Sequence, residues 1–368
     1  MARGEPALED VALDPSFWHG RRVLVTGHTG FKGAWLCVWL EALGAEVAGY
    51  ANAIRTTPSL YELARVEDGL RSCTGDVRDG ESLRAAFDAH RPEVVILMAA
   101  QSLVRASFRD PVTTYETNVL GTVRVLEAAR QSPDVRAIVN VTSDKAYENR
   151  EWEWGYREDD AKGGHDPYSS SKGCAELVGA AYRRSFFAGP DAPALASARA
   201  GNVIGGGDFG EDRLIPDLMR AVSESRPAAI RNPGAVRPWQ HVLNPLSGYL
   251  LLAQRLWERT AGLGDGLNFG PTDGDARPVG AVVERITELW GEDLGWATDP
   301  GPHPHEAHYL KLDSSRARMR LGWRPRWGLE EGLERTVEWY RAHHRGEDVS
   351  ALTRAQVEAF SAVPRPAG

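Results

Sequence analysis

Two residues of this sequence have the types and the spacing of an acid–base pair. Tyr168 and Lys172 are four residues apart in a segment that is predicted to be helical, so both side chains lie on one face of that helix. A phenol with its ordinary pKa of about 10 is a poor base at neutral pH. A neighbouring ammonium favours the phenolate, which could then accept a proton from an alcohol. Because this spacing also arises by chance on helix surfaces, its meaning depends on the rest of the sequence.

A second polar cluster follows an apolar stretch. The segment 137–142 is predicted to be a buried strand, and Ser143, Asp144 and Lys145 come directly after it. Residues just past the carboxyl end of a parallel strand project into the crevice where ligands bind. The sequence therefore predicts that a hydroxyl, a carboxyl and an ammonium group lie near Tyr168 and Lys172.

A glycine-rich segment near the N-terminus connects a predicted strand to a predicted helix. Gly27 permits a tight turn, Gly30 lets the backbone approach a pyrophosphate, and Gly33 lets the helix pack closely on the strand. The start of the helix offers free N–H groups to a phosphate. Glycine loops are also ordinary turns, but this position favours a dinucleotide site. The positive charge of an oxidised nicotinamide would further favour the phenolate of Tyr168.

The type of dinucleotide is less well determined by the residues. The second predicted strand carries no acidic residue at its end, where an acid would normally hold the ribose hydroxyls of NAD. Asn52 is a weak substitute, and Arg55 could contact a ribose phosphate, so NADP stays open at this point. Asp76 and Val77 are predicted to contact the adenine, although an exposed turn explains them almost equally well.

The elements that must position these groups alternate along the chain. Strands that alternate with helices predict an α/β fold with a Rossmann-type, doubly wound parallel sheet. After residue 201 the pattern changes to loops and shorter elements, which indicates a smaller, partly interleaved C-terminal substrate-binding region. We therefore predict an NAD-binding Rossmann domain over 15–200, a substrate-binding region over 201–350, and terminal extensions over 1–14 and 351–368. The predicted strands are 22–26, 46–50, 94–98, 137–142 and 194–199, and a helix is predicted over 168–184.

Composition narrows the classes of partner. The formal net charge of -8 argues against a broad attraction to nucleic acid or to an anionic membrane. The three cysteines are far apart and show neither metal-ligand nor disulfide spacing, as expected for a cytoplasmic protein. No apolar run is long enough to cross a bilayer, and the N-terminus lacks a signal-peptide core. His303, His305 and Glu306 have a spacing that could hold a metal, but no further ligands are evident, so we expect no metal.

Together these motifs resemble the extended short-chain dehydrogenase/reductase family. The resemblance covers the chain from about residue 17 to about residue 345, and it rests on the glycine loop, Met98–Ala100, Asn118, Ser143 and the Tyr168–Lys172 pair. Members of this family bind a nicotinamide cofactor on the Rossmann part and a nucleotide-sugar on the C-terminal part. Further segments resemble one subgroup, the CDP-glucose 4,6-dehydratases. These segments are 27–33, 142–147, 151–156, 201–208, 237–241 and 303–308.

The resemblance implies a dehydration in which NAD is returned unchanged. Tyr168, assisted by Ser143, would take the proton of the sugar's 4-hydroxyl while hydride passes from carbon 4 to NAD. The ketone acidifies the proton on carbon 5, Asp144 protonates the departing 6-hydroxyl, and the hydride returns to carbon 6. In dTDP-glucose dehydratases a glutamate is the base at carbon 5, and here Lys145 stands in its place. Lys145 could be that base, could stabilise the enolate or contact the cofactor, or could simply pair with Asp144.

The resemblance and the motifs together assign residues to two binding sites. A guanidinium suits a pyrophosphate, so Arg213 and Arg237 are predicted to bind the substrate. Alternatively, Arg237 could only anchor a loop through Trp239. The predicted cofactor residues are Gly27, His28, Thr29, Gly30, Phe31, Lys32, Gly33, Asp76, Val77, Ala99, Ala100, Gln101, Asn118, Thr142, Tyr168 and Lys172. The predicted substrate residues, for CDP-glucose or a related nucleotide-sugar, are Ser102, Arg105, Asn202, Arg213, Leu214, Arg237, His241 and His305.

Other functions on the same fold set the alternatives. A nucleotide-sugar 4-epimerase or decarboxylase would share the cofactor site, but an epimerase has no use for the residues that remove water, Asp144 and Lys145. A non-enzymatic cofactor-sensing protein would not need both Tyr168 and Lys172, which are present here. We expect a homodimer or a dimer of dimers, as in the family, with helices after Pro111 and at Tyr168 at the interface.

Overall fold

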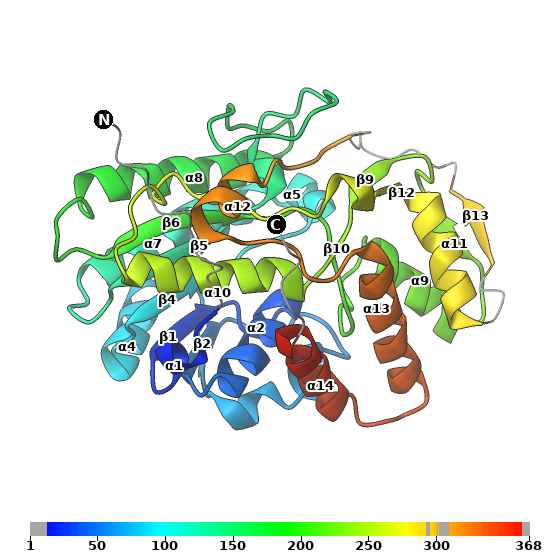
Figure 1. The fold of residues 1–368 in the computed structure, drawn as a ribbon, viewed down its shortest axis with the longest axis horizontal. Helices are drawn as coiled ribbons and strands as arrows, with labels where there is room; N and C mark the ends of the chain where they lie inside the picture. The colour runs from blue at the N-terminus through cyan, green and yellow to red at the C-terminus, as the bar shows by residue number, and fades with distance from the viewer. Residues whose placement is uncertain (1–12, 292–294, 300, 302–308, 363–368) are drawn as a thin grey trace, which may run out of the picture.

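Seven parallel strands form the central layer of the protein in a computed structural model, which describes residues 13–291, 295–299, 301 and 309–362. The strand order is β11-β6-β5-β4-β1-β2-β3, and every neighbouring pair is parallel (Figure 1). The order reverses beside β1, which is the hallmark of a doubly wound sheet. The strands are β1 (Arg22–Thr26), β2 (Glu46–Ala51), β3 (Arg71–Thr74), β4 (Val94–Leu97), β5 (Ala137–Val141), β6 (Ala194–Arg199) and β11 (Leu267–Asn268).

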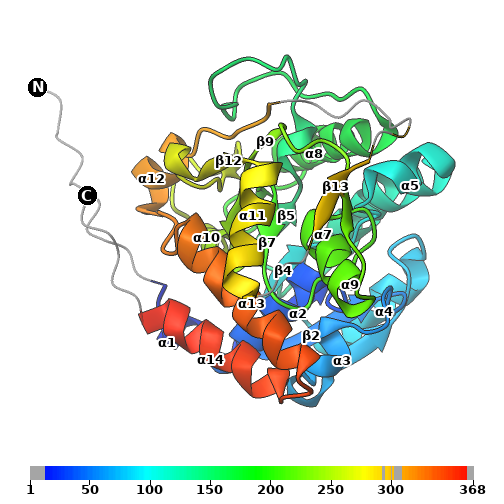
Figure 2. The same ribbon diagram turned by 90° about the vertical axis from the view of Figure 1, so that its right-hand side faces the viewer.

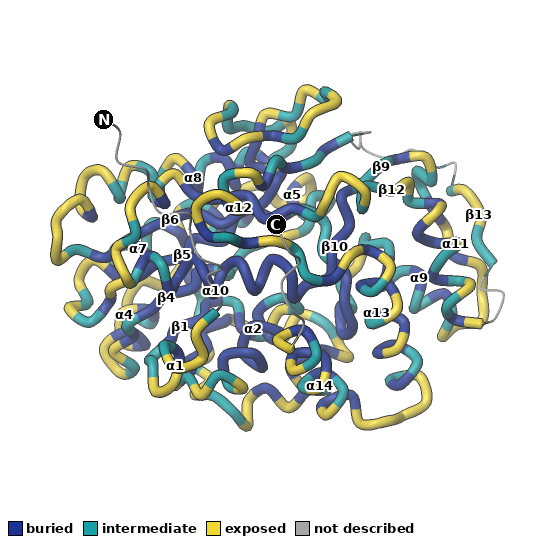
Figure 3. The backbone as a smooth tube through the Cα atoms, in the orientation of Figure 1, coloured by how far each residue is buried: buried dark blue, intermediate teal, exposed yellow. Residues whose placement is uncertain are grey.

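The inner strands are buried on both faces because nearly all of their residues are apolar. Val23 and Val25 of β1 point into one core, and Leu24 between them points into the other. The first core lies against α2 (Phe31–Ala42) and α10 (Leu243–Trp257), and the second lies against α4 (Gly80–His90) and α7 (Gly121–Arg130). Figure 3 shows α10 and the central strands as the most continuously buried backbone. The predicted Rossmann-type fold is therefore confirmed.

Two strands of the sheet were not predicted. β3 has exposed and half-buried side chains only, so it lacks the apolar run of an inner strand. β11 has two residues and comes long after β6 in the sequence, although it pairs with that strand. Both are edge strands, whose local sequence signal is weak because only one side of each is covered by a neighbouring strand.

The C-terminal region gathers beyond the carboxyl end of the sheet, at the right of Figure 1, and is seen from that side in Figure 2. Two of its elements, α10 and β11, belong to the central layers, so residues on both sides of position 200 build the Rossmann unit. The other elements after β6 are β7 (Val203–Ile204), α9 (Leu214–Ser223), β8 (Ala228–Ile230), β9 (Val236–Pro238), β10 (Gln240–His241), the 3-10 turn η4 (Asp273–Asp275), β12 (Ala276–Pro278), α11 (Val279–Trp290), β13 (Trp296–Thr298), α12 (Ser315–Leu321), α13 (Leu329–His344) and α14 (Val349–Ala362).

The last helix covers part of the segment that was predicted to be a C-terminal extension. Residues 351–362 belong to α14, which packs on α2 and α13. Thr353, Val357 and Phe360 are buried at helical spacing, and the ring of Phe360 lies 5.4 Å from that of Trp39. The helix therefore closes the first core.

Among the described residues, no helix is both long and apolar enough to cross a membrane.

Short elements in the first half of the chain position the polar loops. A π-helical turn, η2, interrupts the run from α6 into α7, and the 3-10 turn η3 follows β5 directly. These elements are α1 (Pro15–Trp18), α3 (Leu60–Leu63), η1 (Val66–Gly69), α5 (Val104–Arg109), α6 (Pro111–Tyr115), η2 (Glu116–Leu120), η3 (Asp144–Ala146) and α8 (Pro167–Ser185).

Candidate active site

The end of β5 and the start of α8 bring the predicted catalytic residues together. Ser143 caps the turn η3, and its hydroxyl lies close enough to Tyr168, in the first turn of α8, to lower the pKa of that phenol. Asp166 caps α8 by accepting from the N–H of Ser169, which fixes where the helix begins. Lys172 lies one turn further along the same face and is buried. The structure thus places a hydroxyl, a phenol and an ammonium group side by side at the carboxyl edge of the sheet.

Burial dominates the acid–base properties of this pair. Desolvation raises the pKa of Tyr168 to about 12, against the opposing effects of the Ser143 hydrogen bond and the Arg213 charge. Desolvation also lowers the pKa of Lys172 to about 8. In the protein alone, burial therefore outweighs the stabilisation of the phenolate that was expected from Lys172. The physical reason is that both groups are removed from water, and that the ammonium of Lys172 donates to the carbonyl of Val141 at 3.4 Å.

Asp144 is a buried carboxyl group with one uncommitted oxygen. Its Oδ1 accepts from the hydroxyl of Ser143 at 2.9 Å and from the backbone N–H of Lys145 at 2.8 Å. Its Oδ2 is buried and has no hydrogen-bond partner among the described residues. Desolvation raises the pKa of Asp144, with Lys145 and Arg237 opposing. A carboxyl group that keeps its proton to higher pH and has a spare oxygen is suited to act as an acid.

Lys145 has a different environment from its two neighbours. Its side chain is exposed, and its backbone N–H donates to the hydroxyl of Ser143 at 3.2 Å and to Asp144. No ion pair within the described part of the chain joins Lys145 to Asp144. The interpretation of Lys145 as a simple salt-bridge partner is therefore not supported.

The glycine loop has the tight geometry that a dinucleotide requires. Gly27 has a φ of 75°, and a Cβ at this position would lie 2.9 Å from the backbone of Ala99. A Cβ at Gly33 would lie 2.2 Å from the carbonyl oxygen of Gly27, so α2 approaches the loop as only glycine allows. Gly30 provides no side-chain cap for α2, whose first N–H groups are left for a phosphate. The residues present fit a dinucleotide at this turn.

Two charged or polar residues of this loop point into the protein. His28 is buried, its Nε2 lies 2.9 Å from the hydroxyl of Ser72, and desolvation lowers its pKa to about 4. Lys32 donates to the hydroxyl of Tyr249 at 3.0 Å, and desolvation, together with the charge of Lys172, lowers its pKa to about 7. Lys32 is thus a second, half-buried amine on which the charge of Lys172 acts, a placement that the motif did not predict.

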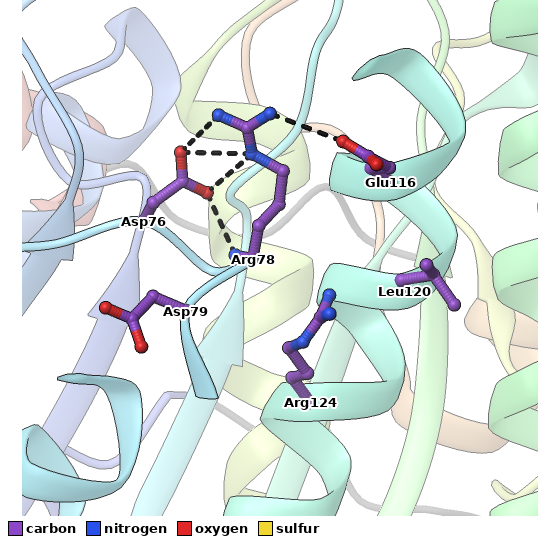
Figure 4. A pocket seen from close by; sticks show the side chains of 6 residues that line it. All are labelled: Asp76, Arg78, Asp79, Glu116, Leu120 and Arg124. Atoms are coloured by element: carbon purple, nitrogen blue, oxygen red, sulfur yellow. Dashed lines mark hydrogen bonds and ion pairs between the residues drawn. The ribbon is translucent and has the colours of Figure 1, made fainter. Parts of the chain in front are cut away.

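The predicted adenine contact lies beside a polar pocket of about 350 Å³, drawn in Figure 4. Arg78 lies between Asp76, with a contact of 2.8 Å, and Glu116, at 3.5 Å. Asn52 donates to Asp76 at 3.1 Å and accepts from Arg55 at 3.0 Å. Asp76 is half-buried in this chain of contacts. Val77 is buried next to it. The pocket is lined by Asp76, Arg78, Asp79, Glu116, Leu120 and Arg124.

Asn118 connects the loop after β4 to the catalytic helix. Its side chain accepts from the N–H of Gln101 at 2.8 Å and donates to the carbonyl of Gln101 and to the hydroxyl of Ser171. It sits in the π-helical turn η2, which aims it inward. Ala99, Ala100 and Gln101 are thereby held beside the glycine loop. Thr142 is buried at the end of β5, and its hydroxyl donates to Glu176.

Two of the predicted substrate residues are arginines that lie near the predicted catalytic residues. Arg213 lies near Tyr168. Its guanidinium donates to Asp208 at 2.8 Å and to the hydroxyl of Ser102 at 3.3 Å. The positive charge of Arg237 lowers the pKa of Asp144, so a second guanidinium group lies near the predicted catalytic residues. Asn202 and Leu214 are half-buried, Asn202 in the loop before β7 and Leu214 at the start of α9. Arg105 forms an ion pair of 3.2 Å with Asp212.

The loop-anchor alternative for Arg237 is not needed to hold Trp239. The indole of Trp239 is buried and donates to the carbonyl of Arg277, across the β9–β12 pair. Arg237 pairs in register with Arg277, so its strand is held by backbone contacts. Its guanidinium donates to the carbonyl of Val236 at 3.1 Å, and its charge lowers the pKa of Asp144, so a group of the right type for a pyrophosphate lies near this carboxyl.

His241, which was predicted to bind the substrate, lies in the protein core. It has no exposed surface, it packs 4.9 Å from the ring of Trp327, and its Nδ1 accepts from the N–H of Leu243. Strand β10 pairs with β7 and packs against α13, which places His241 in the core. His305, and the possible metal ligands around it, lie outside the described residues. Within the described ranges there is no cluster of three metal-ligating side chains.

Sequence reasoning missed a buried ion pair below this site. Glu176 lies one helical turn after Lys172, and its carboxylate binds the guanidinium of Arg199 at 2.7 Å. The four-residue spacing from Tyr168 to Lys172 to Glu176 was the available signal, because all three share one helix face.

Comparisons with known proteins agree with this geometry. The family model described as GDP-mannose 4,6 dehydratase matches residues 24–336. A relative named CDP-glucose 4,6-dehydratase, from Salmonella typhimurium, is 53% identical over 352 residues, which is 95% of this chain and 98% of that protein.

Solved structures share the fold. The NAD complex of a Thermus thermophilus UDP-glucose 4-epimerase is 29% identical, with a TM-score of 0.74 over 87% of this chain and 99% of that one. The NAD complex of a Bacillus anthracis dTDP-glucose 4,6-dehydratase is 23% identical, with a TM-score of 0.74 over 90% of this chain and 100% of that one. The matched residues span the glycine loop, the catalytic turn, α8 and most of the C-terminal region, and the chain therefore belongs to the GDP-mannose 4,6-dehydratase family of extended short-chain dehydrogenase/reductases.

Proposed function

We propose that this enzyme is a CDP-glucose 4,6-dehydratase, which converts CDP-glucose to CDP-4-keto-6-deoxyglucose and water with NAD as its cofactor. The observation that carries the substrate assignment is the 53% identity to a relative of that name over 95% of the chain. The buried carboxyl of Asp144, with its unpartnered oxygen, supports a reaction that eliminates water. A 4-epimerase shares the cofactor fold but has no departing hydroxyl to protonate.

The residues present account for each proton that the reaction moves. Bound NAD would accept the hydride from carbon 4 of the sugar and return it at carbon 6. Tyr168, whose pKa is lowered by the neighbouring Ser143 against the opposing effect of burial, accepts the proton of the 4-hydroxyl while that carbon becomes a ketone. Asp144 then donates its proton to the 6-hydroxyl, which leaves as water as the proton on carbon 5 is removed, and a proton returns to carbon 5 when hydride is delivered to carbon 6. The glycine loop and the start of α2 would hold the pyrophosphate of the cofactor.

A positively charged nicotinamide matters for Tyr168. Burial alone keeps the phenol protonated, since its pKa lies at about 12 in the protein without cofactor. A cation placed against the phenol favours the phenolate. We therefore infer that Tyr168 becomes an effective base only in the complex with NAD. Lys172, as an ammonium, would hold the ribose of the same cofactor and add to this effect.

A substrate panel tests the assignment directly. We expect CDP-glucose to lose one water in the presence of NAD, detected by mass spectrometry, and to turn over faster than dTDP-, GDP- or UDP-glucose. The 4-keto product also absorbs in alkali, whereas the glucose or galactose unit of an epimerase product does not. Turnover of dTDP-glucose alone would overturn the choice of nucleotide. Formation of a CDP-linked 4-epimer without mass loss would overturn the dehydration.

Lys145 is the residue that we assign to the proton on carbon 5. Its exposed side chain follows Asp144 in the catalytic turn and is not committed to that carboxylate. Replacing Lys145 by alanine should preserve hydride transfer from carbon 4 but abolish exchange of the carbon-5 proton with solvent. Single-turnover reduction of NAD and deuterium incorporation measured by mass spectrometry report the two steps separately. Wild-type exchange in Lys145→Ala would show that another group removes this proton.

Exposed apolar side chains support a homodimer. Phe108, Val112 and Tyr115 are exposed by 52%, 66% and 38% on α5 and α6, and Leu177 of α8 is exposed by 63%. These helices contact one another, so the side chains belong to one part of the surface. We infer that two copies pair through this surface. The three cysteines are free, which supports a reducing compartment such as the cytoplasm as the place of action.

A further inference from the structure

A buried carboxylate joins the elements that carry the catalytic residues. The side chain of Glu176 in α8 is 6% exposed. Its Oε1 accepts from Nε of Arg199 at 2.8 Å and from the hydroxyl of Thr142, and its Oε2 accepts from Nη2 of Arg199 at 2.7 Å. Thr142 directly precedes Ser143, and Arg199 is the last residue of β6. One side chain therefore links β5, β6 and α8 beneath the catalytic turn.

The same carboxylate faces the catalytic lysine. Tyr168, Lys172 and Glu176 follow at intervals of four residues on one stripe of α8. The charged groups that face Lys172 are Glu176 on its own helix and Lys32, a second cation, from α2. Burial lowers the pKa of Lys172 to about 8, and the charge of Glu176 opposes that effect. Glu176 is thus the anion that favours the ammonium form of this lysine.

The other surroundings of Glu176 keep it ionised. Arg199 and the hydroxyls of Thr142 and Ser197 hold the pKa of Glu176 below its usual value, although burial alone would raise it. On the far side of the pair, the guanidinium carbon of Arg199 lies 5.5 Å from the centre of the Tyr147 ring. A buried ion pair usually stabilises a fold no better than apolar side chains of the same size. Its position beside Lys172 therefore calls for a role other than stability.

We propose that Glu176 is a positioning residue for the dehydration, which holds Lys172 as an ammonium and, through Thr142, fixes the turn that carries Ser143 and Asp144. Arg199 serves as its counter-ion and keeps the carboxylate in place. The role in turnover rests on the proposed function, whereas the role toward Lys172 concerns cofactor binding and is tested without any sugar. No covalent step is assigned to Glu176.

Three variants test the proposal. Glu176→Gln removes the charge and keeps the shape, but it leaves Arg199 buried without its counter-ion. The double variant Glu176→Gln/Arg199→Met removes both charges and so avoids that unpaired cation. Glu158→Gln is the matched control, because Glu158 is also a buried carboxyl group near Arg199 but does not face Lys172. Calorimetric titration with NAD, from about pH 6 to about pH 9, gives the affinity, and melting experiments give the stability.

Opposite outcomes separate a positioning role from a structural one. In both Glu176 variants, we expect the pH at which NAD affinity is lost to fall by about one unit or more. A neighbouring opposite charge shifts a pKa by that amount. The alkaline limb of kcat/KM for CDP-glucose should move with it, and Glu158→Gln should match the wild type in both. The double variant should melt closer to the wild type than Glu176→Gln.

Two results would overturn the proposal. One is a double variant with wild-type stability and a wild-type pH dependence of NAD binding. The other is failure of both Glu176 variants to fold while Glu158→Gln folds, which would assign Glu176 to folding alone. If the wild type does not turn over CDP-glucose, the proposed function fails, but the NAD titrations still decide the role of Glu176 toward Lys172.

Discussion

Replacing Tyr168 by phenylalanine should lower the rate of hydride transfer by about 10²- to 10⁴-fold, the range typical of a positioned acid–base group. The phenol oxygen is the only part of the side chain that is lost, and the ring still fills its buried site. Substrate and cofactor affinities should therefore change little, so that the loss appears in kcat. Single-turnover reduction of NAD by CDP-glucose measures the step directly.

The matched control for this prediction lies on the same helix. Tyr182 is a partly buried tyrosine of α8, packed beside Phe186 and Phe187 and away from the catalytic turn. Tyr182→Phe should retain wild-type kinetics. A Tyr168→Phe enzyme that reduces NAD within about tenfold of the wild-type rate would contradict the role assigned to this phenol.

Replacing Asp144 by asparagine should block loss of water while hydride transfer continues. An amide oxygen can still accept from Ser143 and from the N–H of Lys145, so the turn should keep its shape. An amide has no acidic proton to give to the 6-hydroxyl, so elimination should slow by about 10²- to 10⁴-fold. Reduced nicotinamide and a 4-keto sugar that retains its 6-hydroxyl should accumulate. Deuterium exchange at carbon 5 should persist, unlike in Lys145→Ala.

The pH dependence gives an independent check on Asp144. Desolvation raises the pKa of its carboxyl group, and only the protonated form can act as the acid. Elimination by the wild type should therefore decline as the pH rises through that elevated pKa, and Asp144→Asn should lack this limb. Asp217→Asn is a suitable control, because burial also raises the pKa of Asp217, which pairs with Arg220 in α9. Unchanged product formation by Asp144→Asn would exclude Asp144 as the acid.

The sequence by itself determined the central layers and the catalytic motif. Apolar runs in β1, β4 and β5 are strong signals because these strands are buried on both faces. Glycines at Gly27 and Gly33 mark positions where a side chain would collide with backbone. These are local requirements, which a linear pattern can express.

The tertiary structure decided features that depend on contacts between distant segments. Strand β11 is too short to predict alone and exists because it pairs with β6, and α14 closes a core built from the other end of the chain. His241 has the type of a ligand residue, but the packing of α13 over β10 buries it.

Electrostatics also required the fold. Local sequence placed Lys172 next to Tyr168 and predicted a phenol with a lowered pKa, whereas burial of both groups raises that pKa in the protein alone. Desolvation depends on every element that excludes water from a site, so no spacing within one helix can reveal it. The same burial turns Asp144 into a candidate acid and gives Glu176, absent from the predicted site, a place beside the catalytic lysine.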